Sequence, residues 1–139
     1  MLILVNLAFI WGNSLMPGDE SSAVSGGVIQ LLYRIFPFLP TGEGFHMLIR
    51  KLAHFSEFAL LGLLCSGLSM MELEKFPIGL LGAGLASACI DETIQLYVPG
   101  RASSLMDVWI DTAGFAVGAA ILYIGYRFMK NKQVWRKPQ

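Results

Sequence analysis

The chain has 139 residues, of which 55% are hydrophobic and 14% are charged, and its mean hydropathy is +0.59. Soluble domains average about 25% charged residues, so this composition is closer to that of a protein in contact with lipid. It also excludes intrinsic disorder. Ten Lys and Arg residues balance ten Asp and Glu residues, which argues against a nucleic-acid binder. The two cysteines, Cys65 and Cys89, lie in apolar runs and predict neither a disulfide framework nor a zinc finger.

Four apolar segments predict membrane-spanning helices. A helix needs about 20 apolar residues to cross the bilayer core, and the segments 52–71, 76–98 and 105–126 reach this length. The first segment, 2–16, is shorter and could also be the apolar part of a signal peptide. It lacks Lys and Arg at its start, which favours a first spanning helix. We therefore predict an all-α fold, an integral membrane bundle of four transmembrane helices.

The connections between these segments differ in length. The longest runs over 17–51, and its first part, 18–27, is rich in Ser and Gly and is expected to be turn-like. Its middle, 28–40, is too short to span a bilayer and predicts a helix lying at the membrane interface. The connections 72–75 and 99–104 are short, so the helices that they join should pack as antiparallel neighbours.

The basic residues predict the orientation in the membrane. Five Lys and Arg residues gather in the tail 127–139, which the positive-inside rule makes cytoplasmic. With four spans the N-terminus is cytoplasmic too, and the interfacial helix lies in the first extracytoplasmic loop. A basic stretch beside a span is more typical of a lipid anchor than of a nucleic-acid-binding tail. We expect a single multi-pass domain, 1–139, with the lipid bilayer as its partner, and association between copies of the chain is left open.

Ionisable residues in or beside the spans point to function, because each costs about 2.5–3.5 kcal/mol at the middle of a bilayer. One predicted span begins with such residues, the next ends with them and the last begins with them. Spacings of i, i+3 or i, i+4 place His54 and Glu57 on one helix face, as they do Asp107 and Asp111, and they relate both Asp91 and Glu92 to Gln95. The three sets are His54 with Glu57, Asp91 with Glu92 and Gln95, and Asp107 with Asp111.

Antiparallel packing would bring these three sets to the same side of the membrane, which is the outer side in the predicted orientation. Arg101 and Ser104 lie in the connection between two of the helices, and Lys51 can reach the rim. We therefore predict one polar pocket near the outer leaflet. Gly114 and Gly118 follow at a spacing of four and predict close helix packing.

Simpler roles remain open for single residues. Asp107 could be only a charge at a helix N-terminus, and either Asp91 or Glu92 could face water at the rim. Lys51 could be an interfacial side chain whose amine reaches the headgroups. Five ionised carboxylates cannot share a dry pocket with so few cations, so some must be protonated, hydrated or paired with a bound cation.

Four motifs occur in a fixed order along the chain. They are Lys51-x-x-His54-Phe55-x-Glu57-Phe58, Asp91-Glu92-x-x-Gln95, Pro99-Gly100-Arg101-x-x-Ser104-x-x-Asp107-Val108 and Gly114-x-x-x-Gly118. Over residues 9–125 this set resembles the VanZ-like family. The resemblance implies a small bacterial membrane protein, and the name-giving member is linked to resistance to teicoplanin, a glycopeptide that acts on cell-wall precursors outside the membrane. Asp111 departs from the family pattern, in which Asn is expected.

We expect the pocket to bind or modify an envelope lipid or a lipid-linked cell-wall precursor. The predicted catalytic residues, acting as acids and bases, are His54, Glu57, Glu92 and Asp107. The predicted substrate-binding residues, with the basic ones holding an anionic headgroup, are Lys51, Asp91, Gln95, Arg101, Ser104 and Asp111. No cofactor is expected and no metal, since His54-x-x-Glu57 is not the HExxH motif. A proton-coupled transporter and a non-catalytic accessory module are the alternatives.

Overall fold

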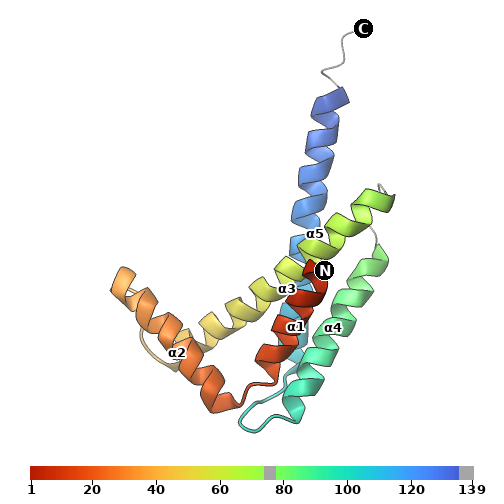
Figure 1. Ribbon diagram of the computed structural model, residues 1–139. Coiled ribbons are helices and arrows are strands. Elements are labelled where there is room, and N and C mark those ends of the chain that lie inside the picture. Colours follow the sequence, from red (N-terminus) through yellow and green to blue (C-terminus); the bar gives the residue numbers. More distant parts are fainter. Residues whose placement is uncertain (74–77, 135–139) are drawn as a thin grey trace.

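The computed structural model describes residues 1–73 and 78–134, and in these ranges the regular secondary structure consists of helices, with no strand. This confirms the predicted all-α class. The helices, in chain order, are α1 (Leu2–Ser14), α2 (Gly18–Ile35), α3 (Glu43–Leu73), α4 (Ile78–Leu96) and α5 (Leu105–Val134). The ends of α1 and α4 and the beginnings of α2 and α5 lie at one end of the molecule, and α5 extends far beyond the other helices at the opposite end (Figure 1).

Two helices are long and apolar enough to cross a membrane: the stretch Glu43–Met70 of α3 and the stretch Leu105–Asn131 of α5. Only 22% and 28% of their most apolar windows are buried inside the protein. The core helix of a soluble protein would bury most of such a window, whereas a helix facing lipid leaves it exposed. The 13 residues of α1 are apolar but shorter than a span, and the 19 residues of α4 include a buried polar set near its end.

The prediction that residues 18–27 are turn-like is wrong, because these residues form the first half of α2. Two acidic residues, Asp19 and Glu20, lie in the first turn, where a carboxylate favours the positive end of the helix dipole. The hydroxyl of Ser22 donates to the carbonyl of Gly18, one turn earlier. Such a bond absorbs the polar side chain within the helix, so the Ser and Gly content does not interrupt it.

Three other boundaries also differ from the sequence-based ones. The helix expected at 28–40 is the second half of α2 and ends at Ile35, shortly before Pro37 restricts the backbone of its preceding residue. The helix expected at 52–71 begins much earlier, at Glu43, so His54 lies about three turns inside α3. The helix expected at 105–126 continues to Val134.

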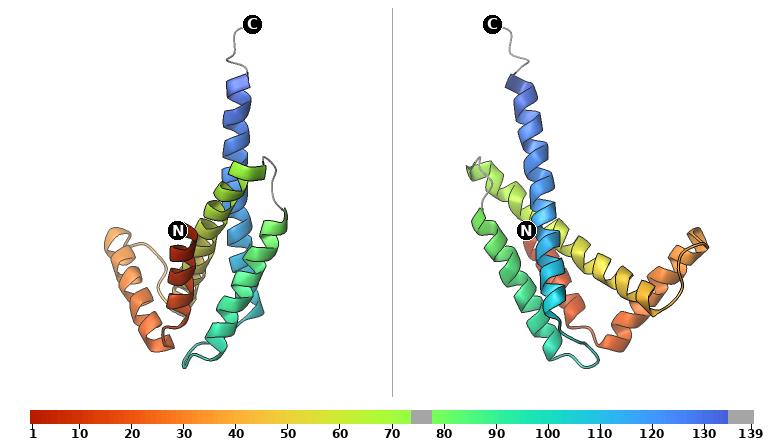
Figure 2. Two further views of the ribbon diagram at one scale, coloured as in Figure 1. Left: turned by 45° about the vertical axis from the view of Figure 1, so that its right-hand side comes forward. Right: turned by 180° about the vertical axis from the view of Figure 1, so that it is seen from behind.

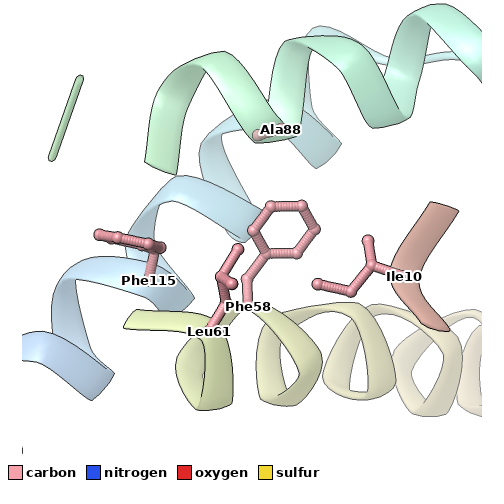
Figure 3. Close-up of a cluster of buried hydrophobic side chains, with 5 residues drawn as sticks. All are labelled: Ile10, Phe58, Leu61, Ala88 and Phe115. Carbon is pink, nitrogen blue, oxygen red and sulfur yellow. The ribbon is translucent and has the colours of Figure 1, made fainter. Parts of the chain in front are cut away.

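A compact apolar core joins four of the helices. Figure 3 shows its side chains meeting from α1, α3, α4 and α5. They are Ile10, Phe58, Leu61, Ala88 and Phe115, each at most 2% exposed. This core fixes the positions of the helices directly below the polar residues of α3, α4 and α5.

Direct backbone contact brings α5 close to α3. A Cβ atom at Gly114 would lie 3.1 Å from the carbonyl carbon of Phe55, and one at Gly118 would lie 2.7 Å from that of Ala59. Both distances are shorter than ordinary carbon contacts, so neither position accepts a side chain without movement of the backbone. This confirms the prediction that the two glycines serve close helix packing, and it places the His54 turn of α3 beside the first turns of α5.

Candidate functional site

The carboxylate of Asp91, near the end of α4, lies at the centre of a buried polar network. The side chain is 0% exposed. The hydroxyl of Ser14 donates to its Oδ1 at 2.6 Å, and Nε2 of Gln95 donates to its Oδ2 at 2.9 Å. Nδ1 of His54 lies 3.9 Å from the same Oδ2. Side chains of α1, α3 and α4 therefore meet at this carboxylate. Figure 2 shows the ribbons of these three helices in two further views.

Asp111, in the second turn of α5, lies beside this network. Its side chain is also 0% exposed. Among the described residues neither of its two carboxylate oxygens has a hydrogen-bond partner, and the same is true of Nδ1 of His54. One side-chain N or O atom from each of His54, Asp91 and Asp111 lies within 4.8 Å of the other two. Helices α3, α4 and α5 thus bring an imidazole and two carboxylates together.

Glu57 belongs to the same end of the bundle but faces α1. Its Oε1 accepts a hydrogen bond of 3.0 Å from Nδ2 of Asn13. The i, i+3 spacing of His54 and Glu57 places them on one side of α3, yet each contacts a different neighbouring helix. The two side chains therefore have different partners, Asn13 of α1 for Glu57 and Asp91 of α4 for His54.

Glu92 holds the connection between α4 and α5. Its Oε2 accepts a hydrogen bond of 2.7 Å from the backbone N–H of Ser104. The hydroxyl of Ser104 in turn accepts a bond of 3.1 Å from the backbone N–H of Met106, which caps the N-terminus of α5. Glu92 is only 4% exposed. Its contact with the backbone N–H of Ser104 helps to set where α5 begins.

Arg101, in the same connection, ties that connection to α1. Its Nε donates to the carbonyl of Met16 at 3.0 Å, and its Nη2 donates to the carbonyl of Asn13. These carbonyls lie at the C-terminal end of α1, where a positive charge interacts favourably with the helix dipole. Burial lowers the pKa of the Arg101 guanidinium from its usual value, and the nearby charge of Arg50 lowers it further.

Lys51 and Asp107 form an ion pair at the rim, with 2.6 Å between Nζ and Oδ1. About a third of each side chain is exposed, at 32% and 29%. Pairs of this exposure contribute little to stability, but this one links α3 to the first turn of α5. Asp107 therefore does more than interact with the helix dipole.

Two cavities lie beside the polar network. The first, which we call the α5 cavity, has a volume of about 340 Å³ and is lined by Met47, Arg50, Lys51, His54, Gln95, Gly100, Ala102, Ser104, Asp107, Ile110 and Asp111. The second, the α2 cavity, has a volume of about 290 Å³ and is lined by Phe9, Asn13, Met16, Ser21, Val24, Ser25, Arg50, Ala53, His54, Glu57 and Arg101. Arg50 and His54 border both cavities.

The structure places all of the predicted site residues at one end of the bundle. Two of them, Asp91 and Glu92, are buried and line neither described cavity. The sequence analysis did not select Arg50 or Ser14 as site residues. Arg50 lies four residues before His54 and so shares its helix face. With the helix predicted to start at residue 52, Arg50 lay outside it, and the shared face could not be predicted.

The fold and the site together define an all-helical protein with two helices apolar enough for a membrane and a buried polar cluster at one end. The sequence model of the VanZ/LLP1 family matches residues 1–126 of the chain. The chain therefore belongs to the VanZ/LLP1 family, which confirms the resemblance found in its motifs. No curated protein and no solved structure matches the chain. The family and the two apolar helices support a membrane location.

Proposed function

We propose that the chain is a four-span protein of the bacterial cell membrane, with both termini in the cytoplasm and the polar end at the outer leaflet. The 30 residues of α5 extend about 45 Å, which exceeds the bilayer core of about 30 Å. Its C-terminal turns carry Arg127 and Lys130 at the end opposite to the polar network (Figure 1). By the positive-inside rule this supports a cytoplasmic C-terminus.

An exposed apolar face of α2 supports the proposed interfacial helix. In Figure 1 this helix leans away from the bundle. Four exposed apolar side chains follow one another along it at the i, i+4, i+7 and i+11 positions of one face: Val24, Val28, Leu31 and Ile35. An exposed apolar helix face of this kind suits the boundary between headgroups and acyl chains.

We propose that the two cavities hold the anionic headgroup of an envelope lipid or a lipid-linked cell-wall precursor. The observation that carries this proposal is the position of Arg50, which borders both cavities and forms no ion pair with a carboxylate of the described residues. A guanidinium binds phosphate oxygens through two parallel donors. Lys51 and Arg101 add positive charge at the edges of the same cavities.

The wall of the α2 cavity combines polar and apolar surface in a way that suits a lipid. Arg50 and Arg101 border it on the polar side, whereas Phe9, Met16 and Val24 contribute apolar surface from α1, α2 and the turn between them. A ligand with a charged headgroup and an acyl chain presents the same two kinds of surface. A free polar metabolite would leave the apolar wall without a partner.

Binding is the function that the geometry supports best. The acid–base roles predicted for His54, Glu57, Glu92 and Asp107 remain predictions. Glu92 contacts a backbone N–H and Asp107 contacts Lys51, so both have a positioning contact already. The core below the polar network is apolar, which favours headgroup binding at one end over a polar path for transport through the bundle.

The test is a binding titration of the purified full chain in nanodiscs. The probes are a fluorescent lipid with an anionic phosphate-monoester headgroup and the same lipid with a phosphocholine headgroup. We expect tighter binding of the anionic lipid and a loss of about tenfold or more in R50Q, the lower range for a charge-assisted hydrogen bond. The matched control R34Q removes an exposed arginine of α2 and should bind as the unsubstituted chain does. Equal affinities for both lipids, or an unchanged R50Q, would refute the proposal.

Given the family, we further propose that headgroup binding contributes to teicoplanin resistance. Cells that express the chain should then grow at higher teicoplanin concentrations than cells that express R50Q at the same level. A resistance that R50Q retains in full would separate the phenotype from headgroup binding and would favour an accessory role.

A further inference from the structure

We propose that His54, Asp91 and Asp111 bind one divalent metal ion of the zinc or manganese class. This proposal goes beyond headgroup binding and does not depend on it, because the metal ligands are an imidazole and two carboxylates and not the basic side chains. The three residues come from α3, α4 and α5, so one ion would join the three helices at the polar end.

The distances between the ligand atoms are slightly longer than those around a common ion. Two atoms that bind one tetrahedral zinc ion at about 2.0–2.2 Å lie about 3.3–3.6 Å apart. Nδ1 of His54 and Oδ2 of Asp91 are 3.9 Å apart. The ligand atoms of all three residues lie within 4.8 Å of one another, so a small movement of side chains completes the set.

The carboxylate of Asp111 supplies a second and independent observation. Its side chain is 0% exposed, and neither of its oxygens has a hydrogen-bond partner among the described residues. An ionised carboxylate in this position is costly unless a cation or donors compensate it. The charges of Asp91 and Glu92 act on Asp111 from α4, so its surroundings add negative charge where a cation would bind.

Two of the neighbouring protein cations are engaged elsewhere, whereas Arg50 of α3 borders the α5 cavity without a carboxylate partner in the described residues. Lys51 pairs with Asp107 at 2.6 Å, and Arg101 donates to backbone carbonyls of α1. Nδ1 of His54 is buried without a hydrogen-bond partner in the described part of the chain and faces Asp91. A metal ion would satisfy this nitrogen together with the oxygens of Asp111.

Asp91 is already oriented as metal ligands usually are. Ser14 and Gln95 each donate a hydrogen bond to one of its oxygens. Each carboxylate oxygen has a further lone pair for a metal. Hydrogen bonds from a second layer of residues fix the direction of a ligand and raise metal affinity.

The donor set selects the class of ion. Magnesium and calcium prefer sets made of oxygen alone, whereas an imidazole suits zinc and carboxylates suit manganese. The two carboxylates balance the charge of a divalent ion. Three protein ligands leave at least one position for water on a four-coordinate ion, and His54 and Asp111 both border the α5 cavity, from which water can reach that position.

The experiment is a metal titration of the full chain, purified in detergent and first stripped with EDTA. Zinc binding is measured by calorimetry, and manganese binding is measured by the loss of the free-ion signal in electron paramagnetic resonance. We expect one ion per chain. Removing an outer hydrogen-bond partner of a metal site typically weakens metal binding by about 10–100-fold, so S14A should lower the metal affinity about tenfold. D111N removes a ligand and should lower the metal affinity at least about 100-fold.

The matched control is E43Q, which removes an exposed carboxylate at the beginning of α3 and leaves the three ligands in place. It should change metal affinity by at most about twofold, because Glu43 lies eleven residues before His54, about 16 Å along the helix, and exposed charges at that distance are screened by salt. Far-ultraviolet circular dichroism and the elution volume establish that each variant is folded. If D111N does not fold, S14A carries the test, since it keeps all three ligands.

Three outcomes would overturn the metal site. They are no saturable binding of either ion by the unsubstituted chain, an unchanged affinity in folded D111N, and equal losses in E43Q and D111N. Lipid binding measured in EDTA separates this result from the proposed function. Headgroup binding without any metal binding would overturn the metal site alone, whereas metal binding without headgroup binding would overturn only the proposed function.

Discussion

Replacing Gly118 with alanine tests whether backbone contact between α3 and α5 holds the polar end together. A Cβ atom there would lie 2.7 Å from the carbonyl carbon of Ala59, whereas carbon atoms pack best at about 3.5–4.0 Å. The helices must therefore separate by about 1 Å, and a gap of this size forfeits roughly a quarter to a half of the dispersion energy of a contact. We expect G118A to lower the free energy of unfolding by about 1–3 kcal/mol.

The matched control is G125A, which makes the same substitution on the same helix. A Cβ atom at Gly125 would meet nothing within 4 Å. There the change to alanine should leave stability the same or raise it by up to about 1 kcal/mol, the difference in helix propensity. The assay is unfolding in mixed micelles with increasing dodecyl sulfate, followed by circular dichroism, for both variants and the unsubstituted chain.

The two variants are expected to move stability in different directions, so the comparison cancels any general effect of the substitution. If G118A is as stable as G125A, the two helices do not approach each other as closely as described. The positions of His54 and Asp111, which depend on this approach, would then be in error as well. A less stable G118A that also binds zinc more weakly would connect the helix contact to the site.

Three further predictions concern the polar network and the orientation. S14A should lower the free energy of unfolding by about 1.5–3 kcal/mol, because Asp91 loses a buried hydrogen bond of 2.6 Å; an unchanged unfolding midpoint would contradict that bond. K51Q should cost at most about 1 kcal/mol in the same assay, because the pair with Asp107 is about one third exposed, and a larger loss would show that the pair is more buried. Reporter fusions should place the C-terminus in the cytoplasm and Thr41, between α2 and α3, outside; the reverse pattern would refute the orientation.

Local sequence pattern was sufficient for much of the fold. Apolar runs of helical length predicted the α-helical class because hydrophobic length is a property of the segment itself. Boundaries were less accessible. At the start of α3, Glu43 interacts favourably with the helix dipole. In residues 18–27 the composition suggests a turn, but the hydroxyl of Ser22 bonds within the helix and does not interrupt it.

The grouping of the polar residues was predictable for a similar reason. Spacings of three and four residues fix which side chains share a face of one helix, and short connections fix which helix ends meet. The chain therefore predicted that His54, Asp91 and Asp111 lie at the same end. It also led to the expectation of no metal, because His54-x-x-Glu57 lacks the spacing of a metal motif within one helix.

What the sequence by itself determined is the set of helices, their apolar faces and the end at which the polar residues gather. Only the tertiary structure decided which of these residues touch. Glu57 forms a hydrogen bond with Asn13, whereas His54 approaches Asp91 of another helix. Such distances depend on how closely the helices approach at glycines such as Gly118, and this is a property of packing between segments that no spacing within a single helix contains.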